Sequence, residues 1–386
     1  MLPGTTDRPL NSMKSFWITS TDGGTVLEPR ESPVPQPAAG QLLVRMRAAG
    51  LNRGEMMARR DLHGQSAAAR PAGGEGAGEV VRLGAGAVGF QPGERVMAAC
   101  RGAFAEFALI DVQNAIAVPP NLSWEEAGGT ALVFQTVHDM VVAQGGLQAG
   151  EWMLITGASS GVGVAALQAA KALGAKVIGT SGSQAKLDKL KQLGLDVAVC
   201  TRGPDFHDAV MQATGGTGAN LIVNNVGGSV FRACVAALAF EGRLATVGYV
   251  DRVLESTIDI TALHAKRLKL FGVSALLRTP EQRAATVRGF VRDLLPFIAN
   301  GRIKPVIDRV FRFEDLPAAK AYMESDNHVG KIVARISPTW LSDNPGQIGG
   351  SGKPMPVPGL RLPIRLKKYP VRLRREFVQK SQCHRP

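Results

Sequence analysis

The chain has 386 residues, of which 45% are hydrophobic and 20% are charged, a composition typical of soluble proteins large enough for two domains. No apolar run reaches the roughly 18 residues that a membrane-spanning helix needs, so the sequence predicts no membrane protein. The formal net charge of +13 is uneven, because residues 338–386 hold ten Lys and Arg against two Asp and Glu. The rest of the chain is only mildly basic, which argues against a nucleic-acid-binding body.

The termini and the cysteines indicate the compartment. Residues 1–11 lack the apolar core of a signal peptide, so we expect a cytoplasmic protein. The four cysteines form no C-x-x-C pair, which favours reduced thiols over a cysteine-rich zinc site. We expect residues 1–12 to be a disordered extension and the proline-rich, basic residues 338–386 to be a disordered tail. Only this tail could bind nucleic acid, and a solvated appendage explains its composition more simply.

The first part of the chain, to about residue 130, is predicted to be rich in β-strands. The segments 14–19, 41–48 and 104–110 have the apolar or alternating pattern of strands, and residues 73–93 are dense in glycine. Short strands separated by glycine turns are typical of a barrel-like β body.

From Thr136 the pattern changes, and short apolar runs alternate with helix-forming stretches to about residue 275. Strands that alternate with helices predict a parallel sheet with helices on both faces. The expected strands are 152–156, 176–179, 197–199, 221–223, 244–247 and 268–273, and the expected helices are 164–170, 184–193, 206–213 and 230–239. An amphipathic helix at 280–299 follows, and strands at 306–311 and 331–335 are expected to return to the first domain.

The strand at 152–156 and its helix are joined by the turn GASSGVG, residues 157–163. In such a setting, small residues let a nucleotide pyrophosphate approach the free N–H groups at a helix N-terminus. The strict G-x-G-x-x-G pattern is not met, because its glycine positions hold Ala158, Ser160 and Gly163. Taken alone, the segment is equally consistent with a tight turn that binds no ligand.

Several segments occur in an order that extends this pattern over residues 13–337. They are AAGLNR at 48–53, GEGAGEV at 74–80, FQPGERV at 90–96, the turn at 157–163, VGG at 226–228 and GKIV at 330–333. With these segments in this order, the chain resembles the zinc-independent quinone oxidoreductase branch of the medium-chain dehydrogenase/reductase superfamily. The resemblance implies an α/β fold with a GroES-like β domain plus a Rossmann domain with a doubly wound parallel sheet. It assigns residues 13–130 and 280–337 to the GroES-like catalytic domain and residues 131–279 to the Rossmann domain, and it implies NADP(H) in the cleft and a homodimer.

The resemblance also raises the question of a metal. Zinc-dependent members of the superfamily have a cysteine ligand at the position of Asn52 and a histidine at the position of Gly74. Zinc needs three or four N, S or O ligands, and these positions offer none beyond Glu75. The sequence therefore predicts no metal. Asn52 is instead expected to donate its amide to a substrate carbonyl as charge develops there, and the alternative is a turn asparagine.

The residues that follow the second strand of the parallel sheet indicate whether the cofactor is NAD(H) or NADP(H). NAD enzymes place an acid about 20 residues past the glycine turn, but residues 180–183 are Thr-Ser-Gly-Ser. Lys186 follows on the next helix, and Thr201 and Arg202 follow the third strand. These groups suit a 2′-phosphate and predict NADP(H), although Lys186 could also be a solvated helix charge. The full set of expected cofactor contacts is Thr136, Ala158, Ser160, Gly161, Val162, Gly163, Ser181, Gly182, Lys186, Thr201, Arg202, Val226, Gly227, Gly248, Tyr249, Phe271, Gly272, Val273 and Lys331.

The sequence leaves the proton donor open. Relatives often carry tyrosines where this chain has Met57, His63 and Phe104. His63 or Arg53 could supply the proton, and so could solvent. Met57 and Phe104 favour an apolar pocket for a flat, hydrophobic acceptor.

A rival family is excluded by its chemistry. The turn and the NNVG segment at 224–227 also resemble motifs of short-chain dehydrogenases, which need a Tyr-x-x-x-Lys pair to transfer a proton. No lysine lies four residues after Tyr249, Tyr322 or Tyr369.

Two classes of function remain. The first is an NADPH-dependent reductase that transfers a hydride to a small hydrophobic quinone or α,β-unsaturated carbonyl without a metal. The second is an NADPH-binding protein with mainly a binding or regulatory role, which could bind RNA through the basic tail. Oxidation of NADPH by a panel of acceptors separates the two classes.

We expect purified protein to contain no stoichiometric zinc and to keep its activity in the presence of a chelator, because the positions of the ligands are lost. Elemental analysis checks the first point, and an assay with and without chelator checks the second. A full equivalent of zinc per chain would contradict our interpretation of Asn52 and Gly74.

Overall fold

The computed structural model describes residues 12–21, 24–56 and 68–337. The expected tail and residues 57–67, which include Met57 and His63, lie outside these ranges, as does the expected extension apart from Ser12. Ser12 was expected in the extension but is the first residue of a strand, because it pairs with Pro33 on the neighbouring strand. No helix in the described ranges is long and apolar enough to cross a membrane.

The first structural body is mostly antiparallel. Its larger sheet has the order β15-β16-β3-β5-β6-β8, with β7 also paired to β3, and its smaller sheet has the order β2-β1-β4. The strands are β1 (Ser12–Thr21), β2 (Gly24–Pro33), β3 (Gln41–Gly50), β4 (Arg70–Pro71), β5 (Glu75–Leu83), β6 (Arg95–Ala99), β7 (Phe107–Asp111), β8 (Ile116–Ala117), β15 (Ile307–Arg312) and β16 (Lys331–Arg335). Its short helices are α1 (Arg53–Met56), η1 (Val112–Asn114), α3 (Trp124–Gly128), η3 (Phe313–Asp315) and α12 (Leu316–Glu324).

Close packing explains the glycines of this body. A side chain at Gly78 on β5 would collide with the backbone of Arg45 on β3, so the two strands can approach only with glycine there. Phe104 is fully buried in the same core. It does not line the candidate site described below, so our inference of an apolar pocket from Phe104 was wrong.

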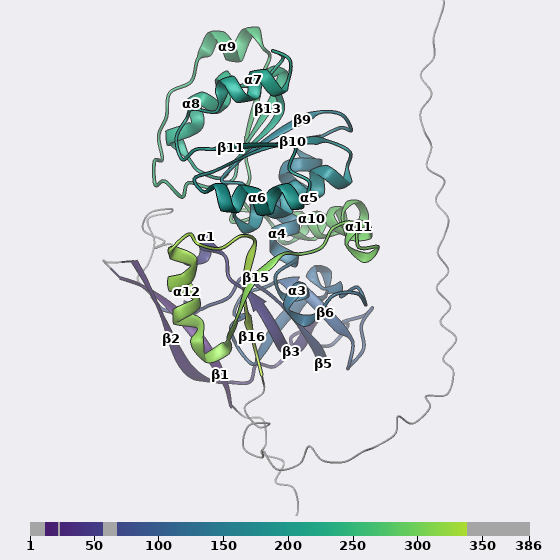
Figure 1. Ribbon diagram of the computed structural model, residues 1–386. Helices are drawn as coiled ribbons and strands as arrows, with labels where there is room; N and C mark the ends of the chain where they lie inside the picture. Colours follow the sequence, from purple (N-terminus) through teal and green to yellow (C-terminus); the bar gives the residue numbers. More distant parts are fainter. Residues whose placement is uncertain (1–11, 22–23, 57–67, 338–386) are drawn as a thin grey trace, which may run out of the picture. The chain divides into compact units, whose positions relative to one another are not determined.

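The second body is a six-stranded parallel sheet of order β11-β10-β9-β12-β13-β14, which confirms the predicted fold class. Helices α5 and α6 lie on one face of the sheet and α7 and α8 on the other (Figure 1). The strands are β9 (Trp152–Thr156), β10 (Lys176–Ser181), β11 (Val197–Cys200), β12 (Ala219–Asn224), β13 (Leu238–Thr246) and β14 (Lys269–Gly272). The helices are α5 (Gly161–Ala172), α6 (Gln184–Gln192), α7 (His207–Ala213), α8 (Gly228–Ala236) and α9 (Ile260–Ala265).

The expected helix at 280–299 differs from the structure in two ways. It is divided into α10 (Pro280–Asp293) and α11 (Leu295–Ala299), because Pro296 has no N–H to continue a helix. It also joins the hydrophobic core beside the parallel sheet, and it keeps a contact with the first body, where the Asn121 side chain donates to the Ile298 carbonyl oxygen at 2.9 Å. Phe290 stacks on Phe134 with ring centroids 6.3 Å apart.

The partners of α10 come from the segment just before the parallel sheet, helices α4 (Ala131–Val137) and η2 (His138–Ala143). A side chain at Gly289 would collide with the His138 ring, so the two helices touch there. Residues 280–299 therefore share the core beside the parallel sheet, whereas β15, η3, α12 and β16 complete the first body.

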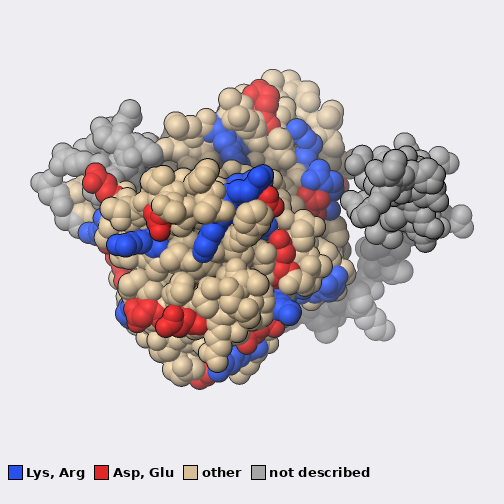
Figure 2. Space-filling view, turned by 90° about the horizontal axis from the view of Figure 1, so that it is seen from above, with Lys and Arg blue, Asp and Glu red and all other residues tan. Residues whose placement is uncertain are grey.

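The surface charge is mixed. On the face in Figure 2, basic and acidic side chains are interspersed, and no patch of one sign covers the face. This part of the described surface offers no continuous basic track for a nucleic acid.

Candidate active site and cofactor cleft

A cavity of about 700 Å³ lies at the carboxyl ends of the parallel strands. Residues 51–55 and 326–332 of the first body form its other wall. The strand order reverses between β9 and β12, and this switch point is where open α/β sheets bind ligands. The volume suits a cofactor together with a small substrate.

The turn between β9 and α5 forms part of the wall. The Ser160 side chain accepts a hydrogen bond from the Gly163 N–H at 3.1 Å and so begins the helix. The N–H groups of Gly161 and Val162 have no partner within a helix, and both residues line the cavity. These groups can hold a pyrophosphate.

Two residues of the motif have a structural role instead. Ala158 is fully buried, and a side chain at Gly163 would lie 2.6 Å from the Ala158 carbonyl oxygen. The tight contact explains why small residues stand at both positions, and neither residue lines the cavity.

A cluster of polar and cationic groups lies beyond the end of β10. Ser181, Gly182, Lys186, Thr201 and Arg202 all line the cavity. Arg202 extends across Gly182 so closely that any side chain at 182 would collide with it. Burial lowers the pKa of Lys186, and the nearby charge of Arg202 lowers it further. Two neighbouring cations at the edge of a cavity fit a 2′-phosphate.

An acid also reaches this end of the cavity, and it is already paired. Asp326 forms an ion pair with Arg53, and its backbone oxygen accepts a hydrogen bond from the Lys186 ammonium. The guanidinium of Arg53 also donates to the Met323 carbonyl oxygen at 2.8 Å. Arg53, a candidate proton donor in the sequence, therefore links α1 to the end of α12.

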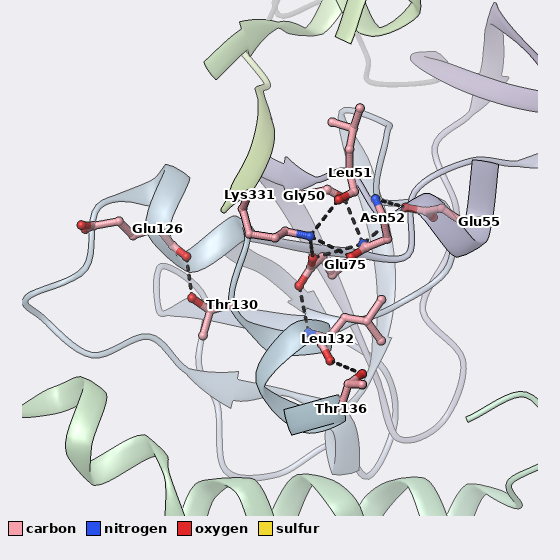
Figure 3. A network of polar contacts seen from close by, with 10 residues as sticks. All are labelled: Gly50, Leu51, Asn52, Glu55, Glu75, Glu126, Thr130, Leu132, Thr136 and Lys331. Carbon is pink, nitrogen blue, oxygen red and sulfur yellow. Dashed lines mark hydrogen bonds and ion pairs between the residues drawn. The ribbon is translucent and has the colours of Figure 1, made fainter. Parts of the chain in front are cut away.

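The other end of the cavity is built on Lys331 and Glu75 (Figure 3). The Lys331 ammonium donates to the Leu51 carbonyl oxygen at 2.8 Å, to Asn52 Oδ1 at 2.7 Å and to Glu75 Oε1 at 2.7 Å. An ammonium has three N–H donors, so all of them are used. Glu75 is fully buried, and its Oε2 accepts the Leu132 N–H at 2.8 Å.

The network also holds the phosphate turn. A Cβ at Gly161 would lie 2.9 Å from Cδ of Lys331, so the lysine stem packs on the first turn of α5. The Gly330 N–H donates to the Ser159 carbonyl oxygen at 3.0 Å. The two walls of the cavity are therefore fixed to each other at this point.

The orientation of the Asn52 amide follows from its partners. Lysine can only donate, so the atom facing Lys331 must be the amide oxygen. The amide nitrogen then faces Glu75 Oε1 at 3.1 Å, the Gly50 carbonyl oxygen at 3.3 Å and Glu55 Oε1 at 3.4 Å. Donation to a substrate carbonyl, which we predicted, would require Asn52 to give up one of these contacts.

Glu55 is a cavity residue that our sequence reasoning missed. Its side chain is half-buried, and its Oε1 accepts the Asn52 backbone N–H at 3.2 Å. Burial is the main reason that the pKa of Glu55 rises to about 7. Glu75 raises this pKa further, whereas Lys331 and the hydrogen bonds from Asn52 lower it. A single glutamate in a short helix gives no sequence signal of such surroundings.

His328 was also missed. It lines the cavity next to Arg53 and Lys186, and burial together with these two cations lowers its pKa to about 4. It is therefore neutral near pH 7. His63, the histidine that the sequence singled out, lies outside the described residues.

The expected contacts divide into two groups in the described structure. Those that line the cavity are Asn52, Arg53, Thr136, Ser160, Gly161, Val162, Ser181, Gly182, Lys186, Thr201, Arg202, Val226, Gly248, Tyr249, Val273 and Lys331. Those that do not are Ala158, Gly163, Gly227, Phe271 and Gly272. Gly227 belongs to a turn that the Asn224 side chain closes, because Asn224 Oδ1 accepts the N–H groups of Val226 and Gly227.

The described residues contain no group of three or more His, Cys, Asp or Glu side chains that could hold a metal ion. Cys100 lies near Glu75 and Glu55, and burial with these two acids raises its pKa to about 12. It therefore stays a thiol, which is a poor metal ligand.

Two family models match the chain. The alcohol dehydrogenase GroES-like domain matches residues 38–120, and the zinc-binding dehydrogenase family matches residues 161–288. The chain is 32% identical over 331 residues to the spectinabilin polyketide synthase system protein NorB of Streptomyces orinoci. The match covers 84% of this chain but 14% of that protein, so the chain spans a small part of its length.

Solved structures match over nearly their whole length. An NAD-dependent alcohol dehydrogenase is 30% identical, with 84% of this chain and 100% of that chain covered at a TM-score of 0.73. The mycobacterial protein Rv1454c complexed with NADPH is 28% identical, with 84% and 99% covered at a TM-score of 0.75. A mycobacterial quinone oxidoreductase is 27% identical, with the same coverage and a TM-score of 0.71.

The buried pair can be tested by unfolding the protein. We expect Lys331→Met to lower the free energy of unfolding by about 3–5 kcal/mol, because it leaves the Glu75 carboxylate buried without its cation. The double variant Lys331→Met/Glu75→Gln should recover much of this loss, because it removes the charge as well. Lys304→Met, whose side chain is 78% exposed, should change the value by less than about 1 kcal/mol and serves as the control. Urea titration measures all of them, and equal losses in Lys331→Met and the double variant would contradict the interpretation.

Proposed function

The chain belongs to the medium-chain dehydrogenase/reductase superfamily, in its quinone-oxidoreductase-like branch, and we propose that it is an NADPH-dependent reductase. Its acceptor is a small hydrophobic quinone or α,β-unsaturated carbonyl, and it works without a metal. The observation that carries the proposal is one continuous cavity that is lined by two cations, Lys186 and Arg202, and by Asn52 and Glu55. We call the part of the cavity wall at Asn52 and Glu55 the floor.

The residues of the cavity fit NADP(H) in three places. Lys186, Arg202 and Ser181 would hold the 2′-phosphate, and the N–H groups of Gly161 and Val162 would hold the pyrophosphate. When bound, the cofactor supplies the hydride. The complex of the related Rv1454c with NADPH supports this choice.

The acceptor would lie between the cofactor and the network of Lys331 and Glu75. Leu51, Leu132, Val133 and Ile332 give this region apolar walls, which favour a flat hydrophobic molecule and exclude water. The related quinone oxidoreductase supports a quinone, whereas the relative from a polyketide synthase system supports an α,β-unsaturated carbonyl.

A homodimer is part of the proposal. Strand β14 is an edge of the parallel sheet, and its neighbourhood exposes Phe240, Leu270 and Leu277. An unpaired strand edge beside exposed apolar side chains suits pairing with a second copy.

A panel of acceptors tests the function. The purified chain should oxidise NADPH in the presence of a quinone, an enone or an enoyl thioester, measured by loss of NADPH absorbance, and product analysis should show which bond was reduced. Binding of NADPH without oxidation by any of these classes would favour the alternative, a protein with a binding or regulatory role.

The choice of NADPH over NADH depends on Lys186. Lys186→Glu should weaken NADPH binding by about 10- to 100-fold, because a carboxylate would face the 2′-phosphate. Binding of NADH, which lacks this phosphate, should change much less. Lys189→Glu makes the same charge change on the same helix outside the cavity and should leave both affinities nearly unchanged. Fluorescence titration measures the affinities, and equal losses for both cofactors in Lys186→Glu would contradict the assignment.

A further inference from the structure

We propose that Glu55 is the acid that protonates the acceptor after the hydride has been transferred. This inference rests on the proposed function, and it assigns a catalytic role that our sequence reasoning left open between His63, Arg53 and solvent.

Lys331 and two acids that also line the cavity, Asp326 and Asp251, are already engaged. Lys331 uses all three of its N–H donors within the network. Asp326 is paired with Arg53. Asp251 accepts hydrogen bonds from the Ser229 N–H at 2.9 Å, from the Ser229 hydroxyl at 2.5 Å and from the Val253 N–H at 3.0 Å. None of these groups is placed to give a proton to a substrate.

The Glu55 carboxyl is held at one oxygen and open at the other. Its Oε1 accepts the Asn52 backbone N–H at 3.2 Å, which fixes the carboxyl against the floor. Its Oε2 has no hydrogen-bond partner among the described residues. A Cβ at Gly74 would lie 2.9 Å from this oxygen, so the carboxyl occupies space that a side chain at 74 would take. Oε2 is therefore the atom that can carry a proton and present it to the cavity.

The charges around Glu55 suit an acid that works near neutral pH. Glu75 on β5 lies close to it as a second carboxylate, and Lys331 on β16 lies close to it as a cation. The Arg70 guanidinium on β4 also donates to the Glu55 backbone carbonyl oxygen at 2.9 Å. Cys100 is close to both acids and stays neutral, because its pKa is about 12. With burial, these charges bring the pKa of Glu55 to about 7, which is where an acid can both hold and release a proton.

With an α,β-unsaturated carbonyl, the hydride brings two electrons and one hydrogen to the β-carbon and leaves an enolate. The Oε2–H bond of Glu55 breaks, the proton bonds to the α-carbon, and the electron pair stays on the carboxylate. With a quinone, the same proton goes to the oxygen of the reduced ring. Water then returns a proton to Glu55.

The pH dependence of turnover tests the step. For the wild type, kcat/KM should fall about tenfold per pH unit above about pH 7, because only the protonated carboxyl can act. Glu55→Gln keeps the shape of the side chain but cannot donate the proton, so its kcat should drop by about 10²- to 10⁴-fold. Its kcat/KM should also no longer fall above pH 7. Glu55→Asp should restore part of the rate and the decrease of kcat/KM at high pH. Glu28 on β2 is exposed and does not line the cavity, so Glu28→Gln is the control and should retain the wild-type profile.

A second measurement needs no turnover. A carboxyl whose pKa is raised on folding opposes the folded state once it ionises, so wild-type stability relative to Glu55→Gln should fall from about pH 4.5 to about pH 7. Above pH 7 the difference should be constant. Thermal unfolding of both proteins across this range gives the curve, and a Tm difference independent of pH would overturn the proposal.

The outcomes separate the two proposals. If no acceptor is reduced although NADPH binds, the proposed function fails, and the role of Glu55 fails with it. If acceptors are reduced and Glu55→Gln retains both the wild-type rate and the decrease of kcat/KM at high pH, the proposed function is supported and Glu55 is not the acid.

Discussion

The buried pair of Lys331 and Glu75 is the interaction on which the site depends. The two residues are 256 positions apart in the chain, and their side chains are 7% and 0% exposed. Burying two charges costs several kcal/mol each unless other polar groups surround them. The Leu51 carbonyl, the Asn52 side chain and the Leu132 N–H supply these groups. The buried pair is thus tolerated only because these surrounding groups are held in one arrangement. The same groups form the floor of the cavity.

The charged side chains around the cavity differ from one part of it to another. Lys186 and Arg202 lie beyond the end of β10, whereas Glu55 lies beside the neutralised pair of Lys331 and Glu75. Under the proposed function, the 2′-phosphate of NADPH would lie at the two cations and its hydride-donating ring would lie toward Glu55, because the attraction for the phosphate sets the direction. The proposed transfers of hydride and proton would then occur at the same end of the cavity.

Much of the fold could be predicted from the sequence, because local patterns determine it. Strands such as β9 are short apolar runs buried on both faces, and helices follow them at regular spacing, so the parallel sheet was visible in periodicity alone. The core that a helix joins is not a local property. The amphipathic pattern of α10 indicated a buried face, but Phe134 and His138, which cover it, lie far away in the sequence.

The site residues could be predicted where they belong to a sequence motif. They could not be predicted where their properties depend on tertiary packing. Lys186 and Arg202 follow strands of a recognised order, and the structure places both in the cavity. Ala158 and Gly163 stand at motif positions, but they serve the contact between turn and helix. Glu55 and His328 owe their shifted pKa values to burial and to charges from distant strands, which no spacing in the sequence reveals.

The position of β16 has a consequence for biosynthesis. This strand lies between β15 and β3 in the larger sheet, and it carries Lys331. As the chain leaves the ribosome from its N-terminus, the first body is synthesised early but lacks two of its strands and the cation for Glu75 until residue 335 has emerged. The parallel sheet has all of its strands by residue 272 and can fold first. The body that is synthesised first is therefore the one that is completed last, and until then the edge of β3 and the Glu75 carboxylate lack their partners on β16.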